Sequence, residues 1–257
     1  MNIPFYKYQG TGNDFVIIDN SSLFFPKENT ATINKLCDRH FGIGADGLIL
    51  LENDAIADFK MVYFNADGKE STMCGNGGRC IVAFAHFLGL CSNKTTFNAI
   101  DGLHNATINN NIVSLQMIDV DDIDVRKNHT FLDTGSPHHV QVVDNLEDFL
   151  VVIAGRKLRN AYGDEGSNIN FVEKIDDKNF SVRTYERGVE DETLACGTGV
   201  TAVAIAMHKT KRTSEKNINL KVLGGELSVS FEIDNNVYKN VFLKGSAKFI
   251  FQGEIVI

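Results

Sequence analysis

The sequence predicts a mixed α/β fold built from two similar halves, and three observations support this prediction. Strand-like runs outnumber helical ones along the 257 residues. One helical pattern, with similar residues in front of it, occurs twice. The composition is that of an ordinary globular chain, 43% hydrophobic and 23% charged. A chain of this length can form one large domain or two of about 130 residues each.

The expected strands are runs in which apolar residues alternate with polar ones or follow one another over a strand's length. Many strands with few helices favour an α+β or mixed α/β fold over a doubly wound parallel sheet. The strand-like runs span residues 47–52, 59–64, 111–118, 138–143, 168–175, 180–185, 226–233 and 240–245.

Helices and turns punctuate these strands. Asparagine runs at 109–111 and 235–236 predict hairpin turns. The acidic stretch 119–124 suits either a linker between domains or a surface loop within one. Helical patterns are expected at 30–39, 76–88, 146–154 and 197–209.

The internal repeat is found by sliding the chain by 122 residues (196 − 74), which places 63–86 on 185–208 without a gap. We interpret it as two halves built alike, each with a strand, a loop, a cysteine and a buried central helix. The matched pairs are Tyr63 and Tyr185, Glu70 and Glu192, Cys74 and Cys196, Gly75 and Gly197, Gly77 and Gly199, and His86 and His208.

Cys74 and Cys196 each stand at the start of an expected helix. A helix N-terminus presents unpaired N–H groups and partial positive charge, which stabilise a thiolate and can hold a carboxylate. Two such thiols on opposite faces of an amino-acid α-carbon could remove a proton from one face and deliver one to the other. The helix ends would stabilise the negative charge that develops on the carboxylate. The pattern therefore points to inversion of an amino-acid α-carbon.

The remaining cysteines have simpler interpretations. Cys37, Cys80 and Cys91 are expected to be small buried hydrophobes. The spacing of Cys74 and Cys80 fits no common zinc motif, so no metal is expected. A disulfide between Cys74 and Cys196 would be an inactivating oxidation rather than a structural feature.

The segment "GIGADG" at 42–47 has the spacing of a dinucleotide-binding loop. Such a loop must follow a strand and open a helix, whereas here a helical segment precedes and a strand follows. We therefore expect a helix C-terminal turn and no nicotinamide cofactor.

Charge and cysteine usage limit the partners. The net charge is −8, and the longest basic run is residues 209–212, so no nucleic acid partner is expected. No signal peptide or membrane span is evident, so no membrane partner is expected. Five irregularly spaced cysteines argue against a disulfide framework. The predicted location is a reducing cytoplasm.

The chain resembles the diaminopimelate epimerase family, whose members need no pyridoxal phosphate or other cofactor. The resemblance runs almost end to end, through several motifs in the same order. It implies two domains, each a curved, barrel-like sheet around a central helix, with the active site in the cleft between them. The motifs are "GTGNDFVIID" (10–19), "GIGADG" (42–47), "FNADGKESTMCGNGGRC" (64–80), "GSPHHV" (135–140), "GSNINFV" (166–172) and "RTYERGVEDETLACGTG" (183–199).

The resemblance also implies the function and its residues. The expected activity interconverts LL- and meso-2,6-diaminopimelate for lysine and cell-wall precursor synthesis, in a homodimer. Cys74 and Cys196 would be the two catalytic bases, with His138 and Glu186 beside them. Arg187 would hold the distal carboxylate, while Glu186 would help hold an ammonium group. The remaining expected substrate contacts are the backbones of Gly75, Asn76, Gly197 and Thr198 and the side chains of Asn13, Asn65 and Asn168.

Three departures from the family pattern concern the periphery of the site. Gly47 stands where some members carry glutamine, and Ser136 where many carry asparagine. The loop 188–192 is one residue longer than the common form.

The predicted domains are residues 1–117, to which the strand 248–257 returns, and 118–247. A proline or hydroxyproline racemase of the same superfamily is the nearest alternative function, which Arg187 disfavours. A non-catalytic amino-acid-binding protein and a hydride-transfer enzyme are the others.

Overall fold

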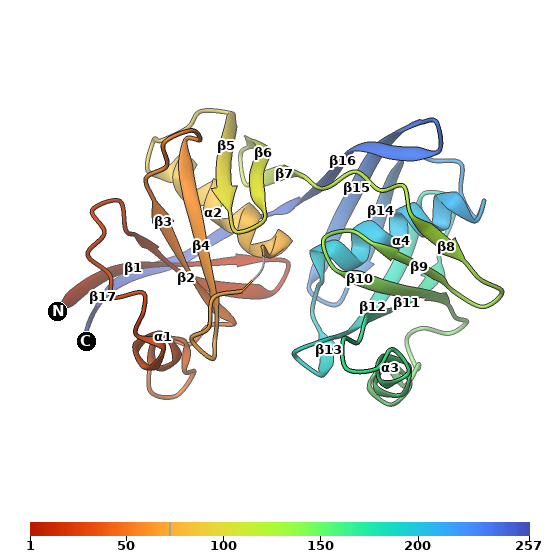
Figure 1. Cartoon of the computed structure of the whole chain (residues 1–257), viewed down its shortest axis with the longest axis horizontal. Helices are drawn as coiled ribbons and strands as arrows, with labels where there is room; N and C mark the ends of the chain where they lie inside the picture. Colours follow the sequence, from red (N-terminus) through yellow and green to blue (C-terminus); the bar gives the residue numbers. More distant parts are fainter. Residues whose placement is uncertain (72) are drawn as a thin grey trace. The chain divides into compact units, whose positions relative to one another are not determined.

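The computed structural model describes residues 1–71 and 73–257, which divide into two compact units. The first unit comprises Met1–Leu115 and Gly245–Ile257, and the second comprises Gln116–Lys244. Each unit contains parallel and antiparallel strand pairs together with helices (Figure 1). The predicted mixed α/β class is therefore confirmed.

The first unit holds helices α1 (Thr30–Cys37) and α2 (Gly75–Phe87). Its parallel pairs are β2 with β3 and β4 with β5, whereas β1 pairs antiparallel with both β2 and β17. The chain ends meet there: the Met1 amino group donates to the Ile257 carbonyl at 2.5 Å (Figure 1). The strands are β1 (Asn2–Gly10), β2 (Asn13–Asp19), β3 (Gly47–Glu52), β4 (Phe59–Asn65), β5 (Lys94–Ala99), β6 (Gly102–Asn109), β7 (Ile112–Gln116) and β17 (Lys248–Val256).

The second unit holds helices α3 (Val151–Asn160) and α4 (Gly197–Lys209). Its parallel pairs are β10 with β11 and β12 with β14, and β11 pairs antiparallel with β12. The strands are β8 (Ile123–Val125), β9 (Thr130–Asp133), β10 (Pro137–Val142), β11 (Asn168–Lys174), β12 (Asn179–Glu186), β13 (Asp191–Thr193), β14 (Asn217–Val222), β15 (Gly225–Asp234) and β16 (Val237–Ser246).

Helices α2 and α4 are the centres of their units. Each has 13 residues, and both their first and last residues are 122 apart (197 − 75 and 209 − 87). Residues 75–85 of α2 are all buried, as are all but one of residues 197–207 of α4. Glycine and alanine make up five of the 13 residues in each helix, and these small residues let neighbouring strands pack closely. The repeat read from the sequence is confirmed in this architecture.

The helix expected at 146–154 was misplaced, because α3 begins only at Val151. Asn145 has a φ of +55°, and the backbone N–H groups of Asn145 and Leu146 donate to the carboxylate of Glu173. This long-range anchor holds the preceding residues in a turn. The helical pattern came from the apolar residues 149–153, and it contains no sign of the contact with Glu173.

The acidic stretch 119–124 is part of the second unit rather than a linker. Val120 and Tyr238 exchange backbone hydrogen bonds of 2.9 and 2.8 Å, and β8 follows at once. The expected asparagine turns are confirmed. Asn110, Asn235 and Asn236 all have positive φ, a conformation that asparagine tolerates better than most residues.

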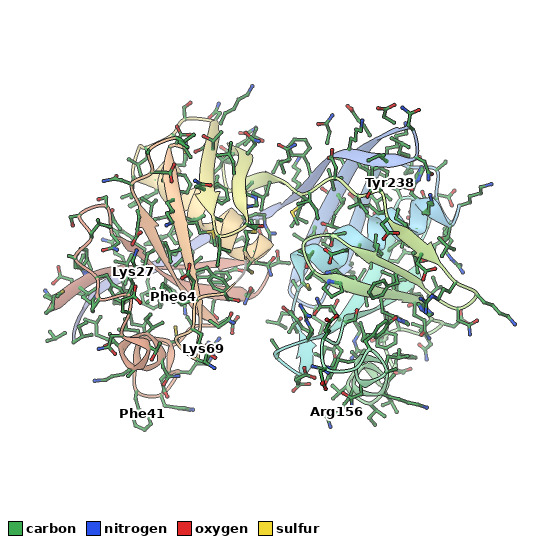
Figure 2. All side chains as sticks on the ribbon, viewed as in Figure 1. Lys27, Phe41, Phe64, Lys69, Arg156 and Tyr238 are labelled. Carbon is green, nitrogen blue, oxygen red and sulfur yellow. The ribbon has the colours of Figure 1, made fainter. Side chains whose placement is uncertain are left out.

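Core and surface positions are clearly separated in the first unit. Phe64 on β4 is buried in an apolar cluster with Val16, Leu48 and Ile33. Phe41, which follows α1, projects from the surface with 83% of its side chain exposed (Figure 2).

Candidate active site

Both central helices begin with a cysteine in the N-cap position. Cys74 and Cys196 have extended backbones, and the carbonyl of each accepts the first helical N–H, from Gly78 at 2.7 Å and Val200 at 3.0 Å. Neither cysteine caps its helix through the side chain. The first-turn N–H groups of each helix therefore remain able to bind a carboxylate.

In the first unit, Asn13 lies against both Cys74 and Asn76. The Cys74 thiol donates to Asn13 Oδ1 at 3.7 Å, and Asn76 Nδ2 donates to the same oxygen at 3.3 Å. Asn13 is the first residue of β2, and the preceding turn residues Thr11 and Gly12 have positive φ. This turn directs Asn13 to the N-terminus of α2.

Arg79 is a residue that the sequence analysis missed. It is fully buried in α2 and donates to the Gly75 carbonyl, to Thr11 Oγ1 and to Asn76 Oδ1 at 3.2, 2.9 and 2.9 Å. Its Nε is buried without a hydrogen-bond partner. A lone arginine inside a helical pattern gives no sign that it points inward. The contact with Thr11, 68 positions away, is what holds it there.

Charged side chains support Asn13 from behind. Asn13 Nδ2 donates to Asp46, and Asp46 also accepts from Arg39 at 2.9 Å. Asp14 pairs with Arg39 and with Lys7, each at 2.7 Å. Burial alone would raise the pKa of Asp14, but hydrogen bonds from Arg39 and Lys7 outweigh burial and lower it. The Asp14 carboxylate therefore stays ionised, and Asp46 fixes the orientation of the Asn13 amide by accepting from its Nδ2.

In the second unit, Cys196 contacts Thr198 and through it Ser136. Cys196 Sγ lies 3.4 Å from Thr198 Oγ1, which lies 3.2 Å from Ser136 Oγ. Thr134 Oγ1 donates to the Thr198 carbonyl at 2.8 Å and ties the start of α4 to the turn before β10. Ser136, noted above only as a departure from the family pattern, is thus a central contact.

His138 is fully buried on β10, and both of its ring nitrogens are engaged. Nε2 lies 3.0 Å from Ser136 Oγ and Nδ1 lies 3.1 Å from Asn170 Nδ2. Burial, with a smaller contribution from Arg187, lowers the pKa of His138 to about 3. The imidazole is therefore neutral at physiological pH.

Asn168, Glu186 and Arg187 lie at the ends of β11 and β12. Asn168 Nδ2 donates to Ser136 Oγ at 3.2 Å, and Asn168 Oδ1 accepts the backbone N–H of Arg187 at 2.9 Å. Arg187 Nη1 donates to the Glu165 carbonyl at 2.8 Å. Glu186 accepts from Thr193 Oγ1 at 2.9 Å. Asn168, Arg187, Ser136, His138, Thr198 and Cys196 thus form one connected group.

Asn65 and Gly47 lie opposite each other on β4 and β3. Asn65 is exposed, and its backbone N–H donates to the Lys69 carbonyl at 3.0 Å. A Cβ at Gly47 would lie 2.5 Å from the Phe64 carbonyl oxygen and 2.6 Å from the Tyr63 ring. The ring of Tyr63 therefore takes the space that a side chain at position 47 would need.

The loop 188–192 is held by Glu190. Its carboxylate accepts from Arg159 Nε at 3.0 Å, from the Gly188 backbone at 3.1 Å and from Tyr185 at 3.2 Å. The loop that exceeds the common family length is therefore anchored to α3 and β12.

The other three cysteines differ from the two at the helix ends. Cys37 and Cys80 are buried, and burial raises the pKa of each to about 12. Both stay protonated, as expected of small hydrophobes. Cys91 is only half-buried, so for it the expectation of a core position was wrong. It follows the end of α2, where the helix leaves the core.

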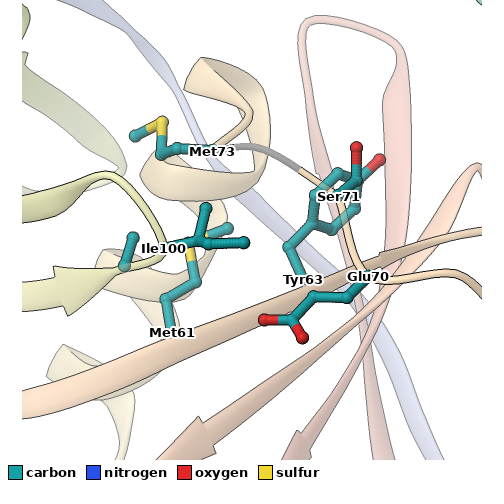
Figure 3. Close-up of a pocket in the computed structure, with 7 residues that line it drawn as sticks. Met61, Tyr63, Glu70, Ser71, Met73 and Ile100 are labelled. Carbon is teal, nitrogen blue, oxygen red and sulfur yellow. The ribbon is translucent and has the colours of Figure 1, made fainter.

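A small cavity lies under the loop that leads to Cys74 (Figure 3). Its volume of about 10 Å³ barely admits one water molecule, so it is no ligand site. It is lined by Met61, Tyr63, Glu70, Ser71, Met73, Ala99 and Ile100.

Residues 1–71 and 73–257 contain neither a metal-binding cluster nor a membrane-spanning helix. No group of three or more histidine, cysteine, aspartate or glutamate side chains there is arranged to hold a metal ion. No helix there has both the length and the hydropathy needed to cross a membrane.

The sequence matches one known protein family over most of its length. The family model described as diaminopimelate epimerase matches residues 5–118 and 130–250. The chain belongs to the diaminopimelate epimerase family. A family member, the diaminopimelate epimerase of Flavobacterium psychrophilum, is 62% identical over 253 residues, which cover 97% of this chain and 99% of that protein. The family consists of epimerases, so this chain is an enzyme of that kind.

Solved structures extend the likeness of fold beyond the diaminopimelate epimerase family. A PhzF-family phenazine biosynthesis protein from Bacillus anthracis matches with a TM-score of 0.77 at 16% identity, covering all of both chains. A hydroxyproline epimerase from Agrobacterium vitis matches with a TM-score of 0.73 at 13% identity, covering 99% of this chain and 92% of that one. At such identities the likeness concerns the fold alone.

Proposed function

We propose that this chain interconverts LL- and meso-2,6-diaminopimelate by a two-base proton transfer at the α-carbon, in which Cys74 and Cys196 are the two bases. The observation that carries the proposal is the pair of 13-residue helices, each with a cysteine at its N-cap and a glycine directly after it. The relative that is 62% identical bears the name diaminopimelate epimerase, which supports the substrate.

The mechanism requires one sulfur on each face of the reacting α-carbon. One cysteine, as thiolate, removes the α-proton, while the other, as thiol, delivers a proton to the opposite face. The backbone N–H groups of Gly75 and Asn76, and of Gly197 and Thr198, would bind the carboxylate. Their positive ends stabilise the charge that moves onto it as the proton leaves. This chemistry needs no cofactor.

The rest of the site selects the substrate. Arg187 would hold the distal carboxylate with its planar fork, and Glu186 would hold an ammonium group. Asn13, Asn65 and Asn168 would supply further polar contacts. His138 acts through Ser136 as a positioning residue in this scheme, because its neutral ring is bonded to Ser136 and Asn170.

The product would serve lysine and peptidoglycan precursor synthesis in the cytoplasm. The two-thiol chemistry fits such a compartment, because glutathione and thioredoxin keep thiols reduced there.

We also propose that the enzyme is a homodimer, formed through the face that carries β17 and the end of α2. The rings of Phe87 and Phe249 stack with their centroids 6.1 Å apart, although the two residues are 56% and 45% exposed. Tyr6 of β1, which is half-buried, contacts the Phe87 ring on the same face, with their ring centroids 5.7 Å apart. Large exposed apolar groups that gather in one place are typical of an interface.

The test is α-proton exchange followed by NMR, with LL-diaminopimelate in D₂O under reducing conditions. The wild type is expected to incorporate deuterium at the α-carbon and to form the meso product. Cys74→Ala and Cys196→Ala should each lose epimerisation, whereas Cys91→Ala, the matched control, should retain it. Full activity in both active-site variants would refute the two-thiol mechanism.

A proline racemase is the alternative that the same assay excludes. Proline has no distal carboxylate for Arg187 to bind. Exchange on proline without exchange on diaminopimelate would replace the proposed substrate.

A further inference from the structure

Two chains of hydrogen bonds end at the two cysteine sulfurs, and they run in opposite directions. Each chain lies within one unit and is anchored by groups that can only donate or only accept. The direction of every hydrogen bond between the anchors then follows from the donor and acceptor capacity of each side chain.

The chain in the first unit presents an acceptor to Cys74. Arg79 can only donate, and its Nη2 donates to Asn76 Oδ1 at 2.9 Å. Asn76 therefore turns Nδ2 toward Asn13 Oδ1, at 3.3 Å. At the far end the Asp46 carboxylate can only accept, and it takes the hydrogen bond from Asn13 Nδ2. The atom of Asn13 that faces Cys74 Sγ, at 3.7 Å, is thus the carbonyl oxygen.

The chain in the second unit starts at Asn170. The His139 carbonyl can only accept, and Asn170 Nδ2 donates to it at 3.1 Å. The same Nδ2 lies 3.1 Å from His138 Nδ1, which must then be the accepting nitrogen. The neutral ring of His138 carries its proton on Nε2 and donates it to Ser136 Oγ at 3.0 Å.

The second chain continues through two hydroxyl groups. Ser136 Oγ also accepts from Asn168 Nδ2 at 3.2 Å, so both of its lone pairs are used. Its own hydrogen is directed to Thr198 Oγ1, 3.2 Å away. Thr198 Oγ1 accepts from Ser136 and has its own hydrogen available for Cys196 Sγ, 3.4 Å away. The atom that faces Cys196 is therefore a hydroxyl donor.

A neighbour that donates a hydrogen bond to a thiolate stabilises the thiolate. A neighbour that accepts the hydrogen of a thiol stabilises the thiol. From this we propose that the free enzyme rests with the thiolate on Cys196 and the thiol on Cys74, and that Ser136 is the positioning residue that sets this order. The proposal rests on the proposed function of the two cysteines as an acid–base pair.

The positive charge of Arg79 works against a thiol at Cys74, because a buried cation stabilises a nearby thiolate. The charged groups on the side of Cys74 include Arg79 on α2, which interacts electrostatically with Cys74, Asp46 bonded to Asn13, and Asp14 with its partners Lys7 and Arg39. The hydrogen bonds of Arg79 go to Gly75, Thr11 and Asn76. The two carboxylates offset part of its field, whereas the contact between Cys74 and Asn13 is direct.

On the side of Cys196, His138 is neutral, and Arg187 contributes to the lowered pKa of His138. Glu186 accepts from Thr193. The donor from Thr198 and the N-terminus of α4 both favour the thiolate at Cys196.

The resting state decides which stereoisomer reacts first. The Cys196 thiolate takes the α-proton and becomes a thiol, while the Cys74 thiol gives its proton to the opposite face and becomes a thiolate. The free enzyme then returns to rest when Cys74 gains a proton from water and Cys196 loses one. The stereoisomer whose α-hydrogen faces Cys196 is thus bound by the resting form, and the other by the exchanged form.

The test is the pH dependence of alkylation of each cysteine by iodoacetamide in the free wild-type enzyme. Trypsin separates Cys74 from Cys80 by cleavage after Arg79, so mass spectrometry reads each peptide separately. The expected midpoint for Cys196 lies at least about one pH unit below that for Cys74. Exposure favours the opposite order, because Cys196 is only 7% exposed while Cys74 is half-buried.

Variants of Ser136 test whether its hydroxyl group sets the order of the two midpoints. Ser136→Ala should slow alkylation of Cys196 at neutral pH by about tenfold and leave Cys74 unchanged. Ser136→Thr keeps the hydroxyl and should restore the wild-type midpoint. Ser228→Ala on β15 of the same unit is the matched control and should change neither cysteine.

In the wild type, a midpoint for Cys74 at a lower pH than that for Cys196 would overturn the proposal. The same midpoint for both cysteines would also overturn it. Equal shifts of both cysteines in Ser136→Ala would overturn the role of Ser136. Alkylation does not depend on turnover. Failure of the α-proton exchange assay with the alkylation order intact would therefore reject the proposed function and not this order.

Discussion

His138 shows how burial changes the chemistry open to a residue. A histidine connected to a cysteine at a helix N-terminus suggests a general base, but this ring is fully buried and bonded at both nitrogens. Its pKa, lowered to about 3, keeps it neutral, so it orients Ser136 rather than carrying a charge. The residue type was predictable from the sequence, whereas its protonation state depends on the packing around β10.

The first prediction concerns the pH dependence of stability. The unfolded chain binds a proton at His138 below about pH 6.5, whereas the folded protein does so only near pH 3. Protons therefore favour the unfolded state, and the free energy of unfolding falls as pH drops from 6.5 toward 3. His138→Asn should reduce this fall by up to a few kcal/mol at pH 4.

The measurement is urea unfolding at pH 7 and pH 4.5, with the difference between the two pH values compared across variants. His40→Asn, at an exposed position, is the control and should preserve the wild-type difference. An unchanged pH dependence in His138→Asn would show that the buried imidazole does not resist protonation.

At the scale of elements, α2 and α4 match in length and in their N-cap cysteines but not in their surroundings. Gly77 and Gly199 occupy equivalent positions (77 + 122). A Cβ at Gly77 would lie 3.2 Å from Ile49 Cδ1 and 3.3 Å from Met61 Cε, which are flexible methyl groups. A Cβ at Gly199 would lie 2.4 Å from Asn170 Oδ1 and 3.3 Å from Cys196 Sγ.

The second prediction follows from this difference. Gly199→Ala should lower kcat/KM by about 100-fold or more, because it displaces Asn170 and with it the chain of side chains that leads to Cys196. Gly77→Ala should lower kcat/KM by less than about tenfold, because methyl ends can move at small cost. Steady-state kinetics of both variants, with circular dichroism to confirm folding, tests the contrast. Equal losses would mean that the two helix ends are equally constrained.

At the scale of the whole molecule, the return of the chain to its first unit exposes an apolar face. β17 pairs with β1 along nearly its full length and carries Phe249, which stacks on the exposed Phe87 at the end of α2. Such a face covered by a second copy of the chain would remove several large apolar side chains from water.

The third prediction tests that face. Phe249→Lys should convert the proposed dimer to a monomer, because a lysine ammonium is costly to bury in an apolar interface. Phe41→Lys makes the same change at a different exposed phenylalanine of the first unit (Figure 2) and should leave the mass unchanged. Sedimentation velocity measures both. A monomeric wild type, or a Phe249→Lys variant that remains dimeric, would contradict the proposed interface.

The sequence by itself determined the features that depend on neighbouring residues. Each central helix begins directly after its cysteine, because Cys-Gly-x-Gly followed by small apolar residues contains both the start signal and the buried face. The asparagine turns and the internal repeat were read in the same way. The start of α3 was missed, since Glu173 holds the preceding turn from 28 positions away.

Only the tertiary structure decided how each cysteine is supported. Arg79, Ser136 and Asn170 carry no local signal, and each has at least one partner 31 to 68 positions away in the chain. Hydrogen bonds have direction, and that direction is set by which donor meets which acceptor after folding. The sequence makes Cys74 and Cys196 look equivalent, whereas the folded units give one an acceptor and the other a donor.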